Sequence, residues 1–164
     1  MKTHHLCPVY RKWLQLNPLV AREHRCALQK QTQQAHLRGD TQEATYLGYQ
    51  TFEAARVILT ALRPVSSDSV KPIQEDVLAF GTMGMYLANL LIKSDNIEEA
   101  HRVLQECQQQ LMTILPLHAT NPSVCKMIVT LQQSLEVGSQ RLLTTKNRVP
   151  PTSIYPQLAS VNIH

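Results

Sequence analysis

Apolar residues recur at helical spacing along most of this chain, and the densest run lies in its middle. Between residues 77 and 92 nearly every position is apolar, so we expect this helix to be buried on nearly every side. In residues 97–115 the apolar side chains fall at three- and four-residue steps, with Glu, Arg and Gln opposite. Because residues 93–96 form only a short link, the pattern predicts that the second helix packs back on the first as an antiparallel hairpin.

Helix start and stop signals divide the remaining sequence into further helices. Asn17-Pro18 and Asn121-Pro122 each place a capping residue before a proline, which is typical of a first helical turn. Residues 40–43, Asp-Thr-Gln-Glu, form a capping-box arrangement in which the glutamate reaches back to the cap. The predicted helices cover residues 7–15, 18–38, 41–62, 77–92, 97–115 and 122–145.

Two of these helices carry features that bear on packing. The helix over 18–38 is only weakly amphipathic, and its thin apolar stripe, expected at the edge of the core, consists of Val20, His24, Leu28 and Ala35. Gly81 and Gly84 stand inside the central helix, where each costs about 1 kcal/mol relative to alanine. They indicate either a close crossing of helices or a kink.

The pattern predicts an all-α fold of about six helices arranged as antiparallel hairpins. A chain of 164 residues suits one domain and buries roughly 70% of its unfolded surface. We expect a single helical domain over residues 1–145. Residues 146–164 contain three prolines and read as an extended or disordered tail.

One short pattern occurs twice. Residues 39–44 and 95–100 each place a cap residue, a glutamate three positions later and then an alanine, at an offset of 56 residues. Over residues 22–115 the chain thereby resembles the tetratricopeptide repeat, which implies a right-handed stack of helical hairpins. That family repeats every ~34 residues, so the helices here are longer, and Gln31 and Thr32 stand where it has apolar and small residues. An irregular bundle of capped hairpins is the alternative.

Charge is distributed unevenly along the chain. The net charge is +4, and charged residues make up only 17% of the sequence. Residues 1–38 contain seven basic and one acidic side chain, residues 39–136 six basic and eleven acidic, and residues 137–164 three basic and none acidic. A basic first segment beside an acidic body is a feature that a partner can recognise.

The residues that usually carry chemistry do not form a known motif. The sequence has no glycine-rich phosphate loop, no Gly-x-Ser-x-Gly and no His-Glu-x-x-His. His4, His5 and Cys7 could ligate a metal with His24 and Cys26, but a site needs three or four converging ligands. We therefore predict no enzyme, metal or other cofactor. The scattered cysteines and the lack of a leader or an apolar span predict a cytoplasmic protein outside the membrane, with reduced, mostly buried thiols.

These features favour a protein–protein interaction module, an adaptor or regulatory protein that binds another protein. The candidate partner-binding residues lie in the basic first segment and are Tyr10, Arg11, Lys12, Trp13, Arg22, Arg25 and Lys30. The alternative is a regulator that binds nucleic acid through residues 9–38. A homo-oligomer is a further option, because two hairpins leave an end of the stack uncovered, and Tyr10 and Trp13 would either cover that end or lie in the interface.

Overall fold

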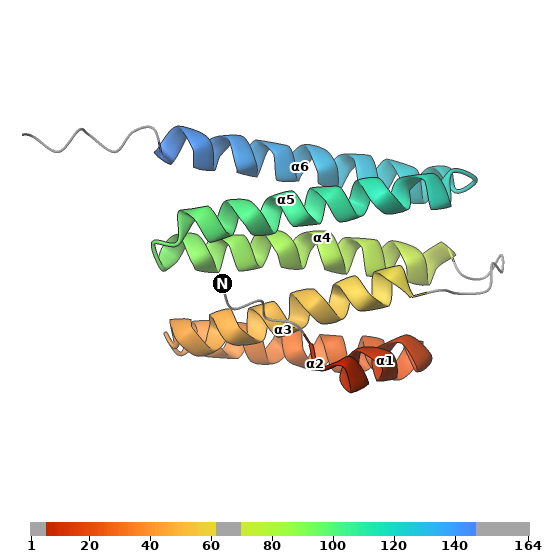
Figure 1. Cartoon of the computed structure of the whole chain (residues 1–164), viewed down its shortest axis with the longest axis horizontal. Helices are drawn as coiled ribbons and strands as arrows, with labels where there is room; N and C mark the ends of the chain where they lie inside the picture. The colour runs from red at the N-terminus through yellow and green to blue at the C-terminus, as the bar shows by residue number, and fades with distance from the viewer. Residues whose placement is uncertain (1–5, 62–69, 147–164) are drawn as a thin grey trace, which may run out of the picture.

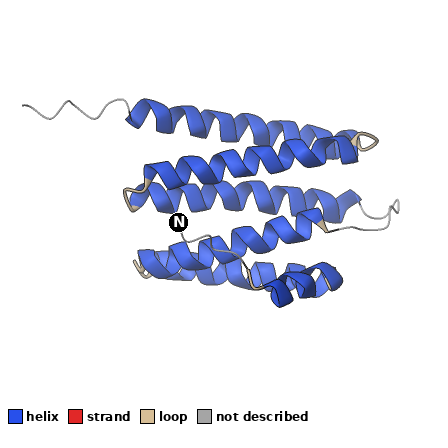
Figure 2. Ribbon diagram, in the orientation of Figure 1, coloured by secondary structure: helices blue, strands red, loops and turns tan. Residues whose placement is uncertain are grey.

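Every regular element that the computed structural model describes, over residues 6–61 and 70–146, is helical (Figures 1 and 2). The α-helices are α1 (Pro8–Leu16), α2 (Pro18–Leu37), α3 (Thr41–Thr60), α4 (Val70–Lys93), α5 (Ile97–Ile114) and α6 (Pro122–Lys146), with the short 3-10 helix η2 (Leu115–His118) before α6. The predicted all-α class with about six helices is confirmed. The largest difference from prediction is α4, which begins well before residue 77. The predicted tail covers residues 146–164; Lys146 is instead the last residue of α6, and residues 147–164 lie outside the described part of the chain.

The long helices lie side by side, from α2 at one edge of the molecule to α6 at the other (Figure 1). Each helix from α2 to α6 packs on the next one along the chain, and α6 also packs on α4. The short α1 packs on α2 and α3. Helix α1 therefore lies on the half of the molecule that contains α2 and α3.

The main core forms around α4, which packs on α3, α5 and α6. The rings of Phe52 and Phe80 stack inside it with centroids 5.0 Å apart. The prediction that α4 is buried on nearly every side is wrong for one stripe, since Leu78 is 46% exposed and Thr82 and Asn89 are exposed as well. These positions are spaced four and seven residues apart, so they share one face, and no helix covers that face among the described residues.

Both glycines of α4 stand where neighbouring helices come close. A Cβ atom at Gly81 would lie 2.8 Å from a methyl group of Leu131 on α6. A Cβ atom at Gly84 would lie 2.9 Å from Sγ of Cys107 on α5 and 3.2 Å from the ring of Phe52. Since α4 continues through both positions, close packing explains these glycines and a kink does not.

The two copies of the repeated turn have the same backbone geometry. Gly39 has φ of 80° and Asp95 has φ of 59°, so both adopt the left-handed conformation that ends many helices. In each turn the amide of the next residue donates to the carbonyl five residues earlier, at 3.0 Å in the first and 2.9 Å in the second. One half of the predicted capping box is present, since Oδ1 of Asp40 accepts from the amide of Glu43 at 3.0 Å. The other half is not formed, because the amide of Asp40 donates to the carbonyl of Ala35 and the Glu43 carboxylate accepts from Arg38. The resemblance to the tetratricopeptide repeat itself stays a prediction.

The buried side of α2 differs from the predicted one. Val20 is 48% exposed, His24 and Leu28 are half-buried, and only Ala35 of the predicted stripe is fully buried. The residues that α2 buries are Ala21, Arg25, Thr32 and Ala35. The hydroxyl oxygens of Thr32 and Thr51 lie 3.2 Å apart. Small and polar side chains thus take the place of the large apolar ones that a sequence pattern detects.

Candidate interaction surface

The aromatic residues near the start of the chain lie together, where α1 crosses α2. The rings of Tyr10 and Trp13 stack with centroids 5.9 Å apart, and His24 packs edge-on against them at 5.4 and 5.7 Å. Tyr10 and Trp13 also pack on the small core cluster beneath α1. The hydroxyl of Tyr10 is buried without a hydrogen bond to any described residue, and burial raises its pKa. These two aromatic residues therefore cover this part of the core.

The inner side of α1 packs on a small apolar cluster of α2 and α3 that we call the α1 groove. Its walls are Ala21 of α2 and Ala54, Val57 and Ile58 of α3, all buried. Leu14 enters the groove and is fully buried. Because three walls come from α3 and one from α2, the α2–α3 hairpin forms the groove by itself.

Two of the predicted partner-binding residues are engaged within the chain. Arg22 donates from Nε and Nη2 to the two carboxylate oxygens of Asp76, both at 2.9 Å. Arg25 donates from Nη1 to Oδ1 of Asp76 at 3.1 Å. The hydrogen bond with Asp76 raises the pKa of the Arg22 guanidinium. The Asp76 side chain is 1% and the Arg25 side chain 8% exposed, so this cluster ties α2 to α4 inside the molecule.

The other basic residues of the segment are available to a partner. Lys12 and Lys30 are exposed and Arg11 is half-buried, and none of the three forms an ion pair with a described residue. Arg38 by contrast pairs with Glu43 at 2.8 Å. The exposed Glu23 lies on α2, one turn beyond the junction with α1. The partner-binding prediction for this segment now depends on the charges of Arg11, Lys12 and Lys30.

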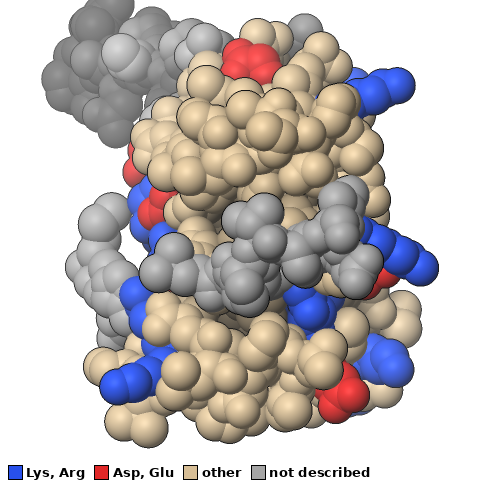
Figure 3. All heavy atoms as spheres, turned by 90° about the vertical axis from the view of Figure 1, so that its right-hand side faces the viewer, with Lys and Arg blue, Asp and Glu red and all other residues tan. Residues whose placement is uncertain are grey.

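Three large apolar side chains, Leu16, Leu19 and Val20, are exposed where α1 meets α2, and Val9 is exposed near the start of α1; we call these four residues the hinge surface. Val9, Leu16 and Leu19 are 77%, 69% and 74% exposed. Positions 9 and 16 lie two turns apart on one face of α1, and positions 19 and 20 belong to the first turn of α2. Figure 3 looks onto this end of the molecule, where charged side chains lie mostly toward the edges. Single exposed apolar residues are ordinary, but a cluster indicates a contact surface.

The sequence did not reveal the hinge surface, because its apolar residues also fit the spacing of buried positions on a helix. Val20 was assigned to the buried stripe, and Leu16 and Leu19 were not singled out. The available signal was the Asn17-Pro18 turn, with apolar residues on both sides of it. A tight turn leaves little room to bury its neighbours, so apolar residues beside it are candidates for exposure.

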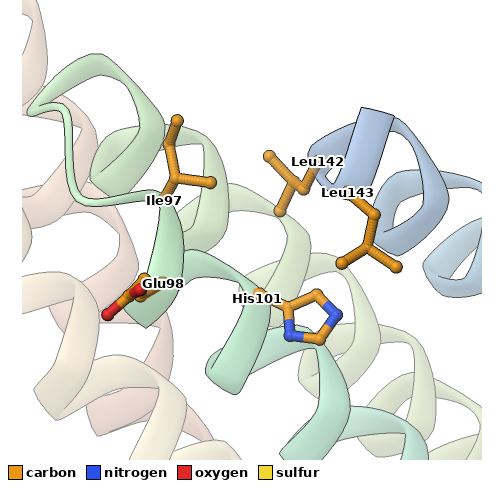
Figure 4. A pocket seen from close by; sticks show the side chains of 5 residues that line it. All are labelled: Ile97, Glu98, His101, Leu142 and Leu143. Carbon is orange, nitrogen blue, oxygen red and sulfur yellow. The ribbon is translucent and has the colours of Figure 1, made fainter. Parts of the chain in front are cut away.

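A pocket of about 230 Å³ opens at the opposite end of the molecule, between α5 and α6. It is lined by Ile97, Glu98, His101, Leu142 and Leu143 (Figure 4). The carboxylate of Glu98 points away from the His101 ring in that view. The two groups therefore do not form the acid–base pair that catalysis would require.

The described residues hold no group of three or more His, Cys, Asp or Glu side chains that could bind a metal ion. His4 and His5, two of the candidate ligands, lie outside the described residues. Cys107 is buried, whereas Cys7 and Cys26 are exposed, so the prediction of mostly buried thiols is wrong for these two. No helix within residues 6–61 and 70–146 has the length and apolar character needed to cross a membrane.

Comparisons with known proteins give no relative. No family model, no curated protein and no solved structure matches this chain. The functional argument therefore rests on the residues and geometry described above.

Proposed function

We propose that this protein is a non-enzymatic interaction module that binds another protein through the hinge surface. The observation that carries the proposal is the exposure of Leu16, Leu19 and Val20 at the junction of α1 and α2, with Val9 exposed on the same face of α1 as Leu16. Lys12, which forms no ion pair with a described residue, lies beside it on α1. An apolar centre with a polar, charged rim is the usual composition of a protein–protein interface. The stack of long helices holds this surface in place, as expected of an adaptor or regulatory protein.

The pocket between α5 and α6 supports this proposal over catalysis. Its lining includes one histidine and one carboxylate, and Figure 4 shows them pointing apart. The remaining lining residues are aliphatic. Neither a nucleophile with its base nor a pair of carboxylates lines this pocket, and those are the groups that a hydrolytic or transfer reaction uses.

The arginine contacts favour a protein over a nucleic acid as the partner. Affinity for nucleic acid grows with the number of phosphates that basic side chains neutralise. Arg22 and Arg25 already bind Asp76, which leaves Arg11, Lys12 and Lys30 for phosphates. A few such contacts give weak and strongly salt-dependent binding.

Cross-linking in cells that produce the protein, followed by mass spectrometry, tests this function. Three full-length chains are compared: the wild type, Leu16→Ser/Leu19→Ser in the hinge surface, and the control Val129→Ser/Val137→Ser. The control residues are 45% and 47% exposed on α6, so they match the change in chemistry at a distant site. We expect a protein partner that the wild type and the control both recover and the hinge variant loses.

Two results would contradict the proposed function. In the first, all three chains recover the same proteins in equal amounts. In the second, nucleic acid alone is recovered, and binding falls steeply with salt and with Arg11→Ala/Lys12→Ala.

A further inference from the structure

The binding of α1 to its groove resembles the binding of a separate helix. At nine residues, α1 is shorter than the ~12–15 residues that an isolated helix needs for marginal stability. It is therefore helical because the α1 groove holds it, chiefly through Leu14. The contact is imperfect, since the Tyr10 hydroxyl is buried without a hydrogen bond to the described residues. A helix bound in this way can be replaced by an identical one.

The connection between α1 and α2 is a single residue. Asn17 is at once the residue after α1 and the residue before α2, and its side-chain amide donates to the carbonyl of Trp13 at 3.0 Å. A residue before proline avoids the helical conformation and prefers an extended one. Pro18 thus keeps α1 and α2 from fusing into one helix. A hinge this short gives α1 little freedom to find its own groove, and short hinges favour exchange of an element between copies.

Leu16, Leu19 and Val20 of the hinge surface flank this connection, and nothing among the described residues covers them. In an exchanged dimer the two hinges cross near the two-fold axis, so the hinge surface of each copy faces that of the other. The charges beside it are suited to such a contact. Lys12 and Arg11 are cationic, and Glu23 on α2 is anionic and exposed, with no ion pair to a described residue. A two-fold axis brings the cations of one copy toward the carboxylate of the other.

We infer that the partner of the hinge surface is a second copy of this chain. Each copy places its α1 in the α1 groove of the other, in place of the resident helix, and the two hinge surfaces bury each other. This inference rests on the proposed function, because it names the protein that the hinge surface binds. Helices α4 to α6 keep their contacts, since α1 packs on α2 and α3.

Sedimentation velocity of the full-length chain over roughly 1–200 μM tests the inference, because dimer formation depends on protomer concentration. Four chains are compared: the wild type, the Leu16→Ser/Leu19→Ser variant, the Val129→Ser/Val137→Ser control, and a chain with Gly-Ser-Gly-Ser inserted between Leu16 and Asn17. The longer hinge lets α1 reach its own groove easily. We expect the wild type and the control to dimerise equally, and each hinge change to raise the dissociation constant at least about tenfold. Circular dichroism checks that every chain keeps its helical content.

Three outcomes would overturn the inference. A wild-type chain that is monomeric over the whole range removes the second copy as partner. A dimer that resists the Gly-Ser insertion but is lost in Leu16→Ser/Leu19→Ser shows docking of the two surfaces without exchange of α1. If the wild type is monomeric while cross-linking recovers another protein that depends on Leu16 and Leu19, this inference fails and the proposed function stands.

Discussion

Replacing Asp76 by asparagine removes the only carboxylate in the described contacts of Arg22 and Arg25 and changes the side-chain shape very little. Among its contacts, Asp76 accepts two hydrogen bonds from Arg22 and one from Arg25. The asparagine keeps one acceptor oxygen, but its NH₂ group faces a guanidinium N–H. The variant therefore leaves Arg25 without a carboxylate partner among the described residues, whereas Glu75 still interacts electrostatically with Arg22.

The size of the effect follows from burial. Removing one member of a buried ion pair costs about 3–5 kcal/mol, because the remaining charge stays in the interior unpaired. The Arg25 side chain is 8% exposed and cannot easily reach water, whereas the Arg22 side chain, at 17%, can turn partly outward. We therefore expect the lower part of that range, about 3 kcal/mol. For a chain of this size that corresponds to a fall in Tm of about 6–12 °C.

Urea unfolding followed by circular dichroism measures the change in the free energy of unfolding. The matched control is Glu43→Gln, which also converts a carboxylate to an amide and also breaks an arginine pair. Its partner is Arg38, and the two side chains are 60% and 47% exposed. An exposed pair contributes about 1 kcal/mol at most. We expect Glu43→Gln to change stability by less than that amount.

The reasoning would be refuted if Asp76→Asn lost no more stability than Glu43→Gln. A double variant adds a second check. Arg25→Met removes the buried charge that Asp76→Asn leaves unpaired, so the double variant should be more stable than Asp76→Asn alone. If the two losses simply add, the cost does not arise from the unpaired charge of Arg25.

Further predictions concern two glycines, a buried cysteine and two helix caps. Gly84→Ala should lower stability by about 1 kcal/mol, because overpacking against Cys107 outweighs the helix propensity gained. Gly138→Ala should raise stability by up to ~1 kcal/mol, since its Cβ atom would meet only an ordinary 3.5 Å contact. Thermal unfolding measures the stability of both glycine variants against the wild type. Burial raises the pKa of Cys107 to about 12, and a thiol reagent should label this residue only on unfolding. Above pH 9.0, the ordinary pKa of a cysteine, the thiol ionises in the unfolded chain but not in the folded one. The urea midpoint should therefore fall as the pH rises above 9.0. Asp40→Ala should lower the free energy of unfolding by about 0.5–2 kcal/mol in the same urea assay. Asn96→Ala should lower it less, because of these two cap residues only Asp40 accepts a hydrogen bond from its helix.

Hydrophobic spacing predicted the helices well wherever the buried side is made of large apolar residues. On α5 and α6 the buried stripes, from Val103 to Leu111 and from Val124 to Leu142, follow the three- and four-residue spacing directly. On α2 the same method selected the wrong side. The interior there contains Arg25 and Thr32, and a single sequence cannot reveal that the arginine faces an aspartate 51 positions away.

The same limit applies to the candidate partner-binding residues. Charge counting treats Arg22, Arg25 and Lys30 alike, and only the three-dimensional contacts with Asp76 separate them. The aromatic residues Tyr10 and Trp13 were correctly recognised as notable, but whether they cover the core or a partner depends on where α1 lies. Exposure of the hinge surface likewise depends on how α1 folds back on α2.

The two halves of the molecule are stabilised in different ways, and this difference connects the fold to the proposed exchange. Around α4 large side chains such as Phe80 and Leu87 fill a continuous core, so opening that half would expose much apolar surface. Under α1 the cluster is small, and α2 is joined to α4 through buried polar contacts that require Asp76 in place. Local opening is easiest where few buried apolar contacts are lost, and the cluster under α1 is much smaller than the core around α4. Helix α1 can therefore leave while the α4–α6 core stays closed, as an exchange between two copies requires.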